Sequence, residues 1–369
     1  KIDKIVLRKM KMALKTPFTT SFSTQTEKHF SVVEVHAGGV VGYGDCSAIS
    51  LPFYNEETNV TAWHIMRDFL IPMLKQSGEI QHPSQARELF AAVKRNNCAK
   101  AAIEGALWDA WAKQQGISLA KAIGGERTRV EAGVSIGIQS TPDRLVEVVD
   151  GYLNEGYKRI KIKIKPGYDF NYVPALRQTF GDITLMVDAN SAYTLDDIDL
   201  FKRMDQFGLL MIEQPLAHDD IIDHRKLQAA IATPICLDES IASAEDARKA
   251  LELGSGRIIN IKVARVGGIT EVKMIHDLCQ QQGVPVWCGG MLDTAVGKAH
   301  NIAIASLPNF VFAHDIPPSA RYWHEDFMLP QVEMDRDSCV AVPEAPGIGF
   351  EINPRLYQEY CYGEESFNF

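Results

Sequence analysis

The sequence offers little to suggest a membrane, secreted or nucleic-acid-binding protein. Its 369 residues contain no apolar run long enough to cross a bilayer, and the basic N-terminus is not followed by a signal-peptide core. The seven cysteines are scattered and show neither Cys-x-x-Cys nor zinc spacing, which favours free thiols in a reducing compartment. With a net charge of −9 and no basic arm, no nucleic-acid partner is expected. These absences predict a soluble cytoplasmic protein.

The composition is that of an ordinary globular chain, with 46% hydrophobic and 23% charged residues. An acidic protein that binds an anion must gather its positive charge locally, and one stretch does so. Residues 159–165 alternate strictly, with isoleucines on one face of a strand and Lys161, Lys163 and Lys165 on the other. Such a strand fits a barrel whose cavity holds an anion, or else an exposed edge strand protected by lysines.

The first part of the chain predicts strands followed by helices. Residues 1–57 contain β-branched runs separated by turns, whereas residues 62–116 repeat their apolar side chains with a helical period. This order is typical of an α+β domain. Residues 16–29 and 51–54 are interpreted as two loops.

After Gly124-Gly125, short apolar strands alternate with helical segments. Eight strands in such an alternation predict an α/β fold, a (β/α)7β TIM-type barrel that lacks a clear eighth helix. We therefore predict an α+β capping domain over residues 1–125, joined by the tail at 325–369, and a barrel over residues 126–324. The eight expected strands cover residues 130–138, 159–165, 183–190, 209–215, 234–240, 257–263, 285–290 and 310–316.

Charged residues recur once in each successive barrel unit. Asp188, Glu213 and Asp238 stand 25 residues apart near the ends of three strands, Lys163 lies 25 residues earlier, and Lys262 lies 24 residues later. Because a barrel gathers its strand ends around one mouth, the five groups are expected to converge there. Taken singly, each carboxylate could instead cap a helix or pair with a surface cation.

The combination predicts metal-assisted proton transfer. Three convergent carboxylates favour Mg²⁺ or Mn²⁺, and the two lysines suit an acid and a base on opposite sides of a metal-bound substrate. Lys161 and the metal would lower the pKa of Lys163, and the metal would stabilise negative charge next to a substrate carboxylate. A metal-free glycosidase barrel has no use for two facing lysines.

The motifs resemble those of the enolase superfamily, in its muconate lactonizing enzyme subgroup. Within it, the resemblance is to o-succinylbenzoate synthases that also racemise N-succinylamino acids. It covers nearly the whole chain and is carried by Arg159-Ile-Lys-Ile-Lys163, Val187-Asp-Ala-Asn190, Ile212-Glu-Gln-Pro215, Pro234-Ile-Cys-Leu-Asp-Glu-Ser240, Asn260-Ile-Lys262 with Arg265-Val-Gly-Gly268, Trp287-Cys-Gly-Gly-Met291, Ser306-Leu-Pro-Asn-Phe310 and residues 99–116.

The resemblance implies roles for individual residues. Asp188, Glu213 and Asp238 would be the Mg²⁺ ligands. Lys163 would be the base on one face, supported by Lys161, and Lys262 the group on the other. Substrate contacts would be Ser135, Gly290, Leu292, Phe22 and Tyr54.

Further positions receive weaker interpretations. Glu239 is expected to support Lys163 or Lys262 from behind, and Lys165 is an extra lysine whose place is open. Asp293 stands where relatives often carry Glu. His218, His224, His300 and His314 are interpreted as surface or hydrogen-bonded histidines.

The resemblance implies a Mg²⁺-dependent lyase that dehydrates 2-succinyl-6-hydroxy-2,4-cyclohexadiene-1-carboxylate in menaquinone biosynthesis, with racemase activity beside it. A dipeptide epimerase or a cycloisomerase would use the same five residues, and a catalytically silent binding protein is a further alternative. The expected partners are a small carboxylate substrate and other copies of the chain in a homo-oligomer, with no membrane.

Overall fold

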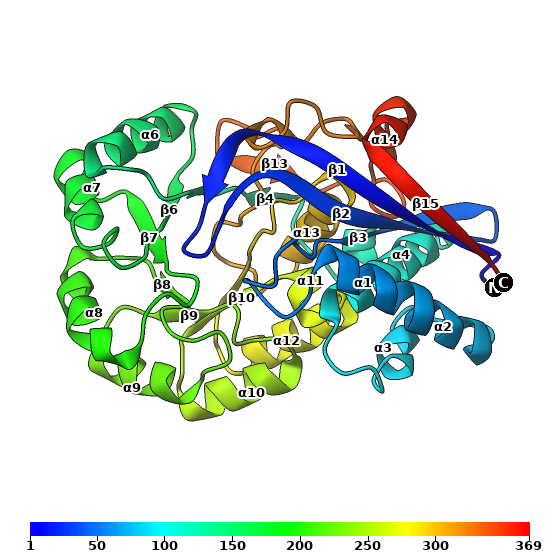
Figure 1. Cartoon of the computed structure of the whole chain (residues 1–369), viewed down its shortest axis with the longest axis horizontal. Coiled ribbons are helices and arrows are strands. Elements are labelled where there is room, and N and C mark those ends of the chain that lie inside the picture. The colour runs from blue at the N-terminus through cyan, green and yellow to red at the C-terminus, as the bar shows by residue number, and fades with distance from the viewer.

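The computed structural model describes all of residues 1–369. Its N-terminal part is an antiparallel sheet ordered β15-β1-β2-β3, followed by helices. In Figure 1 the long β1–β2 hairpin extends across the molecule, and β15 returns from the end of the chain to lie along β1. The elements are β1 (Lys4–Thr19), β2 (Thr24–Ala37), β3 (Val40–Cys46), α1 (Asn59–Ile65), a π-helical turn (Met66–Leu70), α2 (Ile71–Ser77), α3 (Gln85–Leu89), α4 (Asn97–Gln114), α5 (Leu119–Ala122) and β15 (Cys361–Asn368).

Helix α4 packs against β3 because two glycines of the strand let the helix backbone approach. A Cβ atom on Gly44 would lie 1.7 Å from the carbonyl oxygen of Ala102, and one on Gly42 would lie 2.1 Å from that of Ala106. Many buried side chains of the sheet and of α1 to α4 form a second core beside that of the barrel, whereas Met10, Phe30 and Trp108 pack into the barrel core. None of the helices is both long and apolar enough to cross a membrane.

The second part is a parallel sheet of seven strands in chain order, curled into a barrel with helices outside, as Figure 1 shows. The strands are β5 (Val134–Ile136), β6 (Arg159–Lys163), β7 (Thr184–Asp188), β8 (Ile212–Glu213), β9 (Ile235–Leu237), β10 (Ile258–Ile261) and β11 (Val286–Cys288). The helices are α6 (Pro142–Asn154), α7 (Tyr172–Phe180), α8 (Ile198–Met204), α9 (Ile222–Ala230), α10 (Ala244–Leu253), α11 (Val263–Val266), α12 (Ile269–Gln281) and α13 (Ala295–Ala305).

Residues 310–316 close the barrel between β11 and the start of β5. This segment makes isolated bridges at Phe310 and His314 instead of a continuous ladder. Backbone hydrogen bonds from Val311 to Val286 and from Asp315 to Cys288 join it to β11. The predicted (β/α)7β barrel with its α+β cap is confirmed, with a wall segment in place of a regular eighth strand. The proposed domain boundaries stay a prediction.

The tail after the barrel is built from short elements. These are β12 (Met328–Leu329), β13 (Cys339–Ala341), β14 (Glu351–Ile352) and α14 (Pro354–Tyr360), and β13 pairs with β4 (Arg129–Glu131). The strand expected over residues 130–138 is therefore divided between β4 and β5.

Two further local expectations are wrong. Residues 16–29 are not one loop, because the β1–β2 hairpin continues to a turn at residues 20–23. Strand β6 is not an edge strand, because β5 and β7 pair with it on both sides.

Candidate active site

The five charged residues predicted from their spacing lie at the carboxyl ends of consecutive strands. Lys163, Asp188 and Glu213 are the last residues of β6, β7 and β8, while Asp238 and Lys262 directly follow β9 and β10. Strand register places Lys163 beside Asp188, and Asp188 beside Glu213. Side chains alternate along β6. Its isoleucines are buried on the outer side of the barrel sheet, and Lys161 and Lys163 point into the barrel.

Ammonium groups hold the three carboxylates in place. Lys163 Nζ lies 2.5 Å from Asp188 Oδ2, and Lys262 Nζ lies 2.7 Å from Asp238 Oδ2. Lys161 Nζ lies 3.1 Å from Glu213 Oε2 and 3.6 Å from Asp188 Oδ2, so it bridges two of the carboxylates. The two lysines predicted as acid and base therefore stand beside different carboxylates of the same cluster.

The carboxylates perturb one another. Burial raises the pKa of Glu213 well above its usual range, and Asp188 and Asp238 raise it further. Burial alone would raise the pKa of Asp238, but Lys262 and Arg265 lower it far below its usual range. Burial would lower the pKa of Lys262, but Asp238 raises it. Of the three carboxylates, Glu213 alone has a raised pKa, because its burial outweighs the nearby lysines, whereas the pKa values of Asp188 and Asp238 are lowered.

The cluster suits a hard divalent cation chemically. The three carboxylates are at most 1% exposed, and a cation would offset both the burial that mainly raises the pKa of Glu213 and the repulsion from Asp188 and Asp238. The side chains do not stand in metal-ligand geometry, since no group of three acidic, histidine or cysteine side chains is close enough to hold an ion. Their present partners are ammonium groups, so ligation requires the carboxylates to turn toward a common centre.

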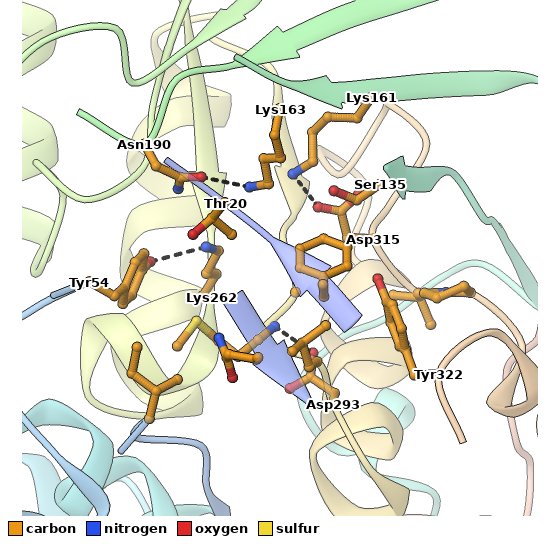
Figure 2. A pocket seen from close by; sticks show the side chains of 18 of the residues that line it. Thr20, Tyr54, Ser135, Lys161, Lys163, Asn190, Lys262, Asp293, Asp315 and Tyr322 are labelled. Carbon is orange, nitrogen blue, oxygen red and sulfur yellow. Dashed lines mark hydrogen bonds and ion pairs between the residues drawn. The ribbon is translucent and has the colours of Figure 1, made fainter. Parts of the chain in front are cut away.

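A cavity of about 740 Å³, including its open mouth, lies beside this cluster. It is lined by Lys161, Lys163 and Lys262, and Figure 2 shows Lys163 and Lys262 entering it from separate strand ends. All the residues predicted as substrate contacts line it as well: Ser135, Gly290, Leu292, Phe22 and Tyr54. Their part in binding stays a prediction.

Tyr54 reaches the cluster from the loop between β3 and α1. Its hydroxyl donates a hydrogen bond of 2.6 Å to Asp238 Oδ1 and accepts one of 3.0 Å from Lys262 Nζ, drawn as a dashed line in Figure 2. The hairpin tip makes a similar link, because Ser21 Oγ donates to the carbonyl oxygen of Asn190 at 3.1 Å. The N-terminal part of the chain therefore contributes directly to the site.

Glu239 is connected to Lys163 through the side-chain amide of Asn190. Asn190 Nδ2 donates to Glu239 Oε1 at 2.9 Å, while Asn190 Oδ1 accepts from Lys163 Nζ at 2.8 Å. Burial raises the pKa of Glu239 to about 8, and Asp238 contributes to this increase. Lys165 does not line the cavity, and its Nζ lies 5.1 Å from the ring centroid of Tyr168.

The four histidines have separate surroundings. His224 bonds to Asp220 and the amide of Leu216, and His314 Nδ1 accepts from the amide of Cys288. His218 is exposed. His300 is buried and its ring hydrogen-bonds the backbone of Tyr43, while its Nε2 has no partner.

Several residues of the site carry no spacing signal in the sequence. Asp315, on the closing segment, accepts from Arg159 at 2.7 Å and from Lys161. Arg265 donates to Asp238 Oδ1 at 2.5 Å, and Asn260 Nδ2 donates to Glu213 Oε1 at 2.5 Å. Asn260 and Arg265 belong to motifs that carry the family resemblance and lie within three residues of Lys262, but neither the motifs nor the spacing gave them a role.

Comparisons with known proteins agree with this geometry. Residues 2–124 match the mandelate racemase / muconate lactonizing enzyme N-terminal domain, and residues 144–356 match the enolase C-terminal domain-like family. The chain belongs to the mandelate racemase / muconate lactonizing enzyme family of the enolase superfamily. Members of this superfamily depend on a divalent metal.

Similar family members match over almost their whole length. An o-succinylbenzoate synthase of Geobacillus kaustophilus is 53% identical, with 100% of this chain and 98% of that protein covered. An N-succinylamino acid racemase of Thermus thermophilus is 43% identical over 95% of each chain. The crystal structure of an enolase superfamily member from Listeria innocua superposes with a TM-score of 0.96 at 41% identity, covering 100% and 99% of the two chains.

Proposed function

We propose that this protein is a Mg²⁺-dependent o-succinylbenzoate synthase that also racemises N-succinylamino acids. The observation that carries the proposal is the pair Lys163 and Lys262, which enter one cavity from β6 and β10 beside three buried carboxylates. Relatives that are 43–53% identical over nearly the whole chain bear one or the other of these two names. The homo-oligomer stays a prediction.

Asp188, Glu213 and Asp238 would hold the metal. When bound, a divalent cation supplies positive charge that stabilises a substrate carboxylate as negative charge develops on it. Lys161 stays anchored between Glu213 and Asp315, where it adds a fixed positive charge beside Lys163.

In the dehydration, Lys163 would take the proton from the ring carbon that bears the carboxylate. The electron pair left behind forms a ring double bond as the neighbouring carbon releases its hydroxyl group. Lys163 then returns the proton to that hydroxyl, so that water leaves and the ring becomes aromatic. Lys262 stays protonated on the other side and stabilises the developing negative charge.

In the racemisation, both lysines would act on one α-carbon. Lys163 removes the proton from one enantiomer and Lys262 delivers a proton to the opposite face, and the roles reverse for the other enantiomer. This use requires one lysine on each face of the substrate, and the entry of Lys163 and Lys262 into the cavity from the ends of two separate strands supports it.

The cavity suits an acylated substrate better than a free dipeptide. A dipeptide carries an ammonium group, which needs an unoccupied carboxylate. Asp315 is already paired with Arg159 and Lys161, and Asp293 Oδ2 accepts from the amide of Met291 and from Asn301, each at 2.9 Å. These contacts favour the synthase and racemase over the dipeptide epimerase.

The test follows the ultraviolet absorbance of the cyclohexadiene substrate as it aromatises, with Mg²⁺, with excess EDTA, and with Mn²⁺ added back. We expect turnover with Mg²⁺, loss with EDTA, and loss in Lys163→Ala by at least about 10³-fold. A protein that binds Mg²⁺ but leaves the absorbance unchanged would refute the synthase assignment. Exchange of dipeptide α-protons in its place would establish the epimerase.

A further inference from the structure

Lys298 is a buried lysine that lines the cavity and has no role in the proposed dehydration or racemisation. It lies in α13, four residues after Thr294, whose carbonyl accepts its backbone amide. Its side chain is 2% exposed and lines the same cavity as Lys163 and Lys262.

The ammonium group of Lys298 has almost no partners inside the protein. Its only hydrogen bond goes to the carbonyl oxygen of Pro317, at 2.5 Å, although an ammonium can donate three. No carboxylate lies close enough to Nζ to form an ion pair, in contrast to Lys161, Lys163 and Lys262, each of which is ion-paired.

The two acidic side chains nearest to Lys298 in charge terms are Asp293 and Asp326, and neither forms an ion pair with it, although Asp326 Oδ2 has no hydrogen-bond partner. Asp293 Oδ2 accepts from Asn301 and Met291, and Asp326 Oδ1 accepts from the amides of Ala295 and Phe327. Burial raises the pKa of Asp326, which weakens it further as a counterion. Burial lowers the pKa of Lys298 itself to about 8, so that most molecules keep the charge at pH 7.

A buried cation without a counterion is costly unless a ligand brings the matching charge. The wall of the same cavity also offers apolar surface for a short methylene chain, from Phe18, Leu292, Ile316 and Tyr322. Both proposed substrates carry a succinyl tail, which is a short methylene chain that ends in a carboxylate. The cavity therefore holds a partner for each part of that tail.

We infer that Lys298 binds the distal carboxylate of the succinyl tail and thereby selects succinylated substrates. This inference rests on the proposed function and deepens it. Lys298 would determine substrate specificity and would take no part in the proton transfers assigned to Lys163 and Lys262.

The test compares N-succinylglycine with N-acetylglycine, which lacks the distal carboxylate. Dissociation constants are measured by calorimetry with Mg²⁺ for the wild type, Lys298→Met and Lys298→Gln. We expect the wild type to prefer N-succinylglycine by about 10- to 100-fold, the usual range for a hydrogen bond to a charged group, and both variants to lose most of that preference. Lys298→Gln keeps a donor for Pro317 and serves where Lys298→Met fails to fold.

Lys28 provides the matched control. Lys28 is also 2% exposed and forms no ion pair. Its Nζ donates to Ser47 Oγ and to the carbonyl oxygen of Leu292. Unlike Lys298, it does not line the cavity. Lys28→Met should therefore retain the preference for the succinyl tail. A preference that survives in Lys298→Met and Lys298→Gln, or a wild type without preference, overturns the inference.

The outcome is separable from that of the proposed function. Neither glycine derivative has a stereocentre to invert, so binding is measured without turnover. A Lys298-dependent preference in a protein that neither aromatises the cyclohexadiene nor racemises N-succinylamino acids would refute the proposed function and uphold this inference. Conversely, turnover of the cyclohexadiene and of N-succinylamino acids, with the preference for N-succinylglycine unchanged in the Lys298 variants, would uphold the proposed function and refute this inference.

Discussion

The hydroxyl of Tyr54 donates a hydrogen bond of 2.6 Å to Asp238, which joins a loop of the N-terminal part to the end of a barrel strand. The same hydroxyl accepts from Lys262, so one phenol positions a proposed metal ligand and a proposed proton donor together.

Removing that hydroxyl should weaken catalysis more than folding. For Tyr54→Phe we expect kcat/KM in the aromatisation assay to fall about tenfold, the usual effect of losing a hydrogen bond to a charged group, because Asp238 and Lys262 each lose a partner. Steady-state kinetics with a thermal melt checks this. Wild-type kcat/KM in the variant would show that the hydroxyl only fills space.

The two lysines should act on opposite faces of an α-carbon. In D₂O, Lys163→Ala should exchange the α-proton of only one enantiomer of an N-succinylamino acid, and Lys262→Ala only that of the other, while racemisation falls by at least about 10³-fold in both. Proton NMR measures the exchange. Lys165→Ala, outside the cavity, should exchange both enantiomers. Two active-site variants that exchange the same enantiomer would contradict the assignment.

Two buried neutral histidines should make the protein sensitive to acid. Burial lowers the pKa of His300 to about 4 and that of His314 to about 3. As the pH falls from the usual histidine pKa toward these values, the two histidines become protonated in the unfolded chain but stay neutral in the folded protein. The free energy of unfolding therefore decreases. For His300 the loss amounts to roughly 3 kcal/mol.

Urea denaturation at about pH 7 and about pH 4.5, on either side of the usual histidine pKa, measures this loss. His300→Asn should start from lower stability, because packing against α4 is lost, but should show a smaller difference between the two pH values. An equal difference in wild type and variant would assign the acid sensitivity to other groups.

The contact between β3 and α4 should tolerate no added methyl group. Gly44→Ala should reduce the free energy of unfolding by about 3 kcal/mol, because the new Cβ atom meets the backbone of Ala102. Gly151→Ala is the control, since a Cβ atom added to Gly151 in α6 would meet nothing within 4 Å, and should raise stability by up to about 1 kcal/mol. An unchanged urea midpoint for Gly44→Ala would mean that the helix can move away.

The sequence is most informative where a repeat unit imposes regular spacing. One strand and one helix take about 25 residues, so the interval between Asp188, Glu213 and Asp238 by itself indicates one shared barrel mouth. The alternation of β6 likewise predicts which face carries Lys161 and Lys163. Period and spacing are local properties of the chain, and therefore they can be read directly.

Contacts made by irregular segments are harder to predict. Asp315 lies on a wall segment without strand periodicity, and its pairing with Arg159 and Lys161 depends on how the barrel closes. Lys298 escapes prediction because a lysine in an apolar helix shows neither spacing nor motif. The loop expected over residues 16–29 is wrong since its many Thr and Ser residues, which are common in turns, also occur in strands.

The closing segment at residues 310–316 is the seam of the barrel. It is joined to its neighbours by isolated bridges, and the same few residues carry the carboxylate that anchors Lys161. Any local opening of this segment also removes one of the three carboxylates that pair with Lys161, so opening of the wall disturbs the position of that lysine. Amide hydrogen exchange at Val311 and Asp315 should therefore report how often the enzyme leaves its competent state.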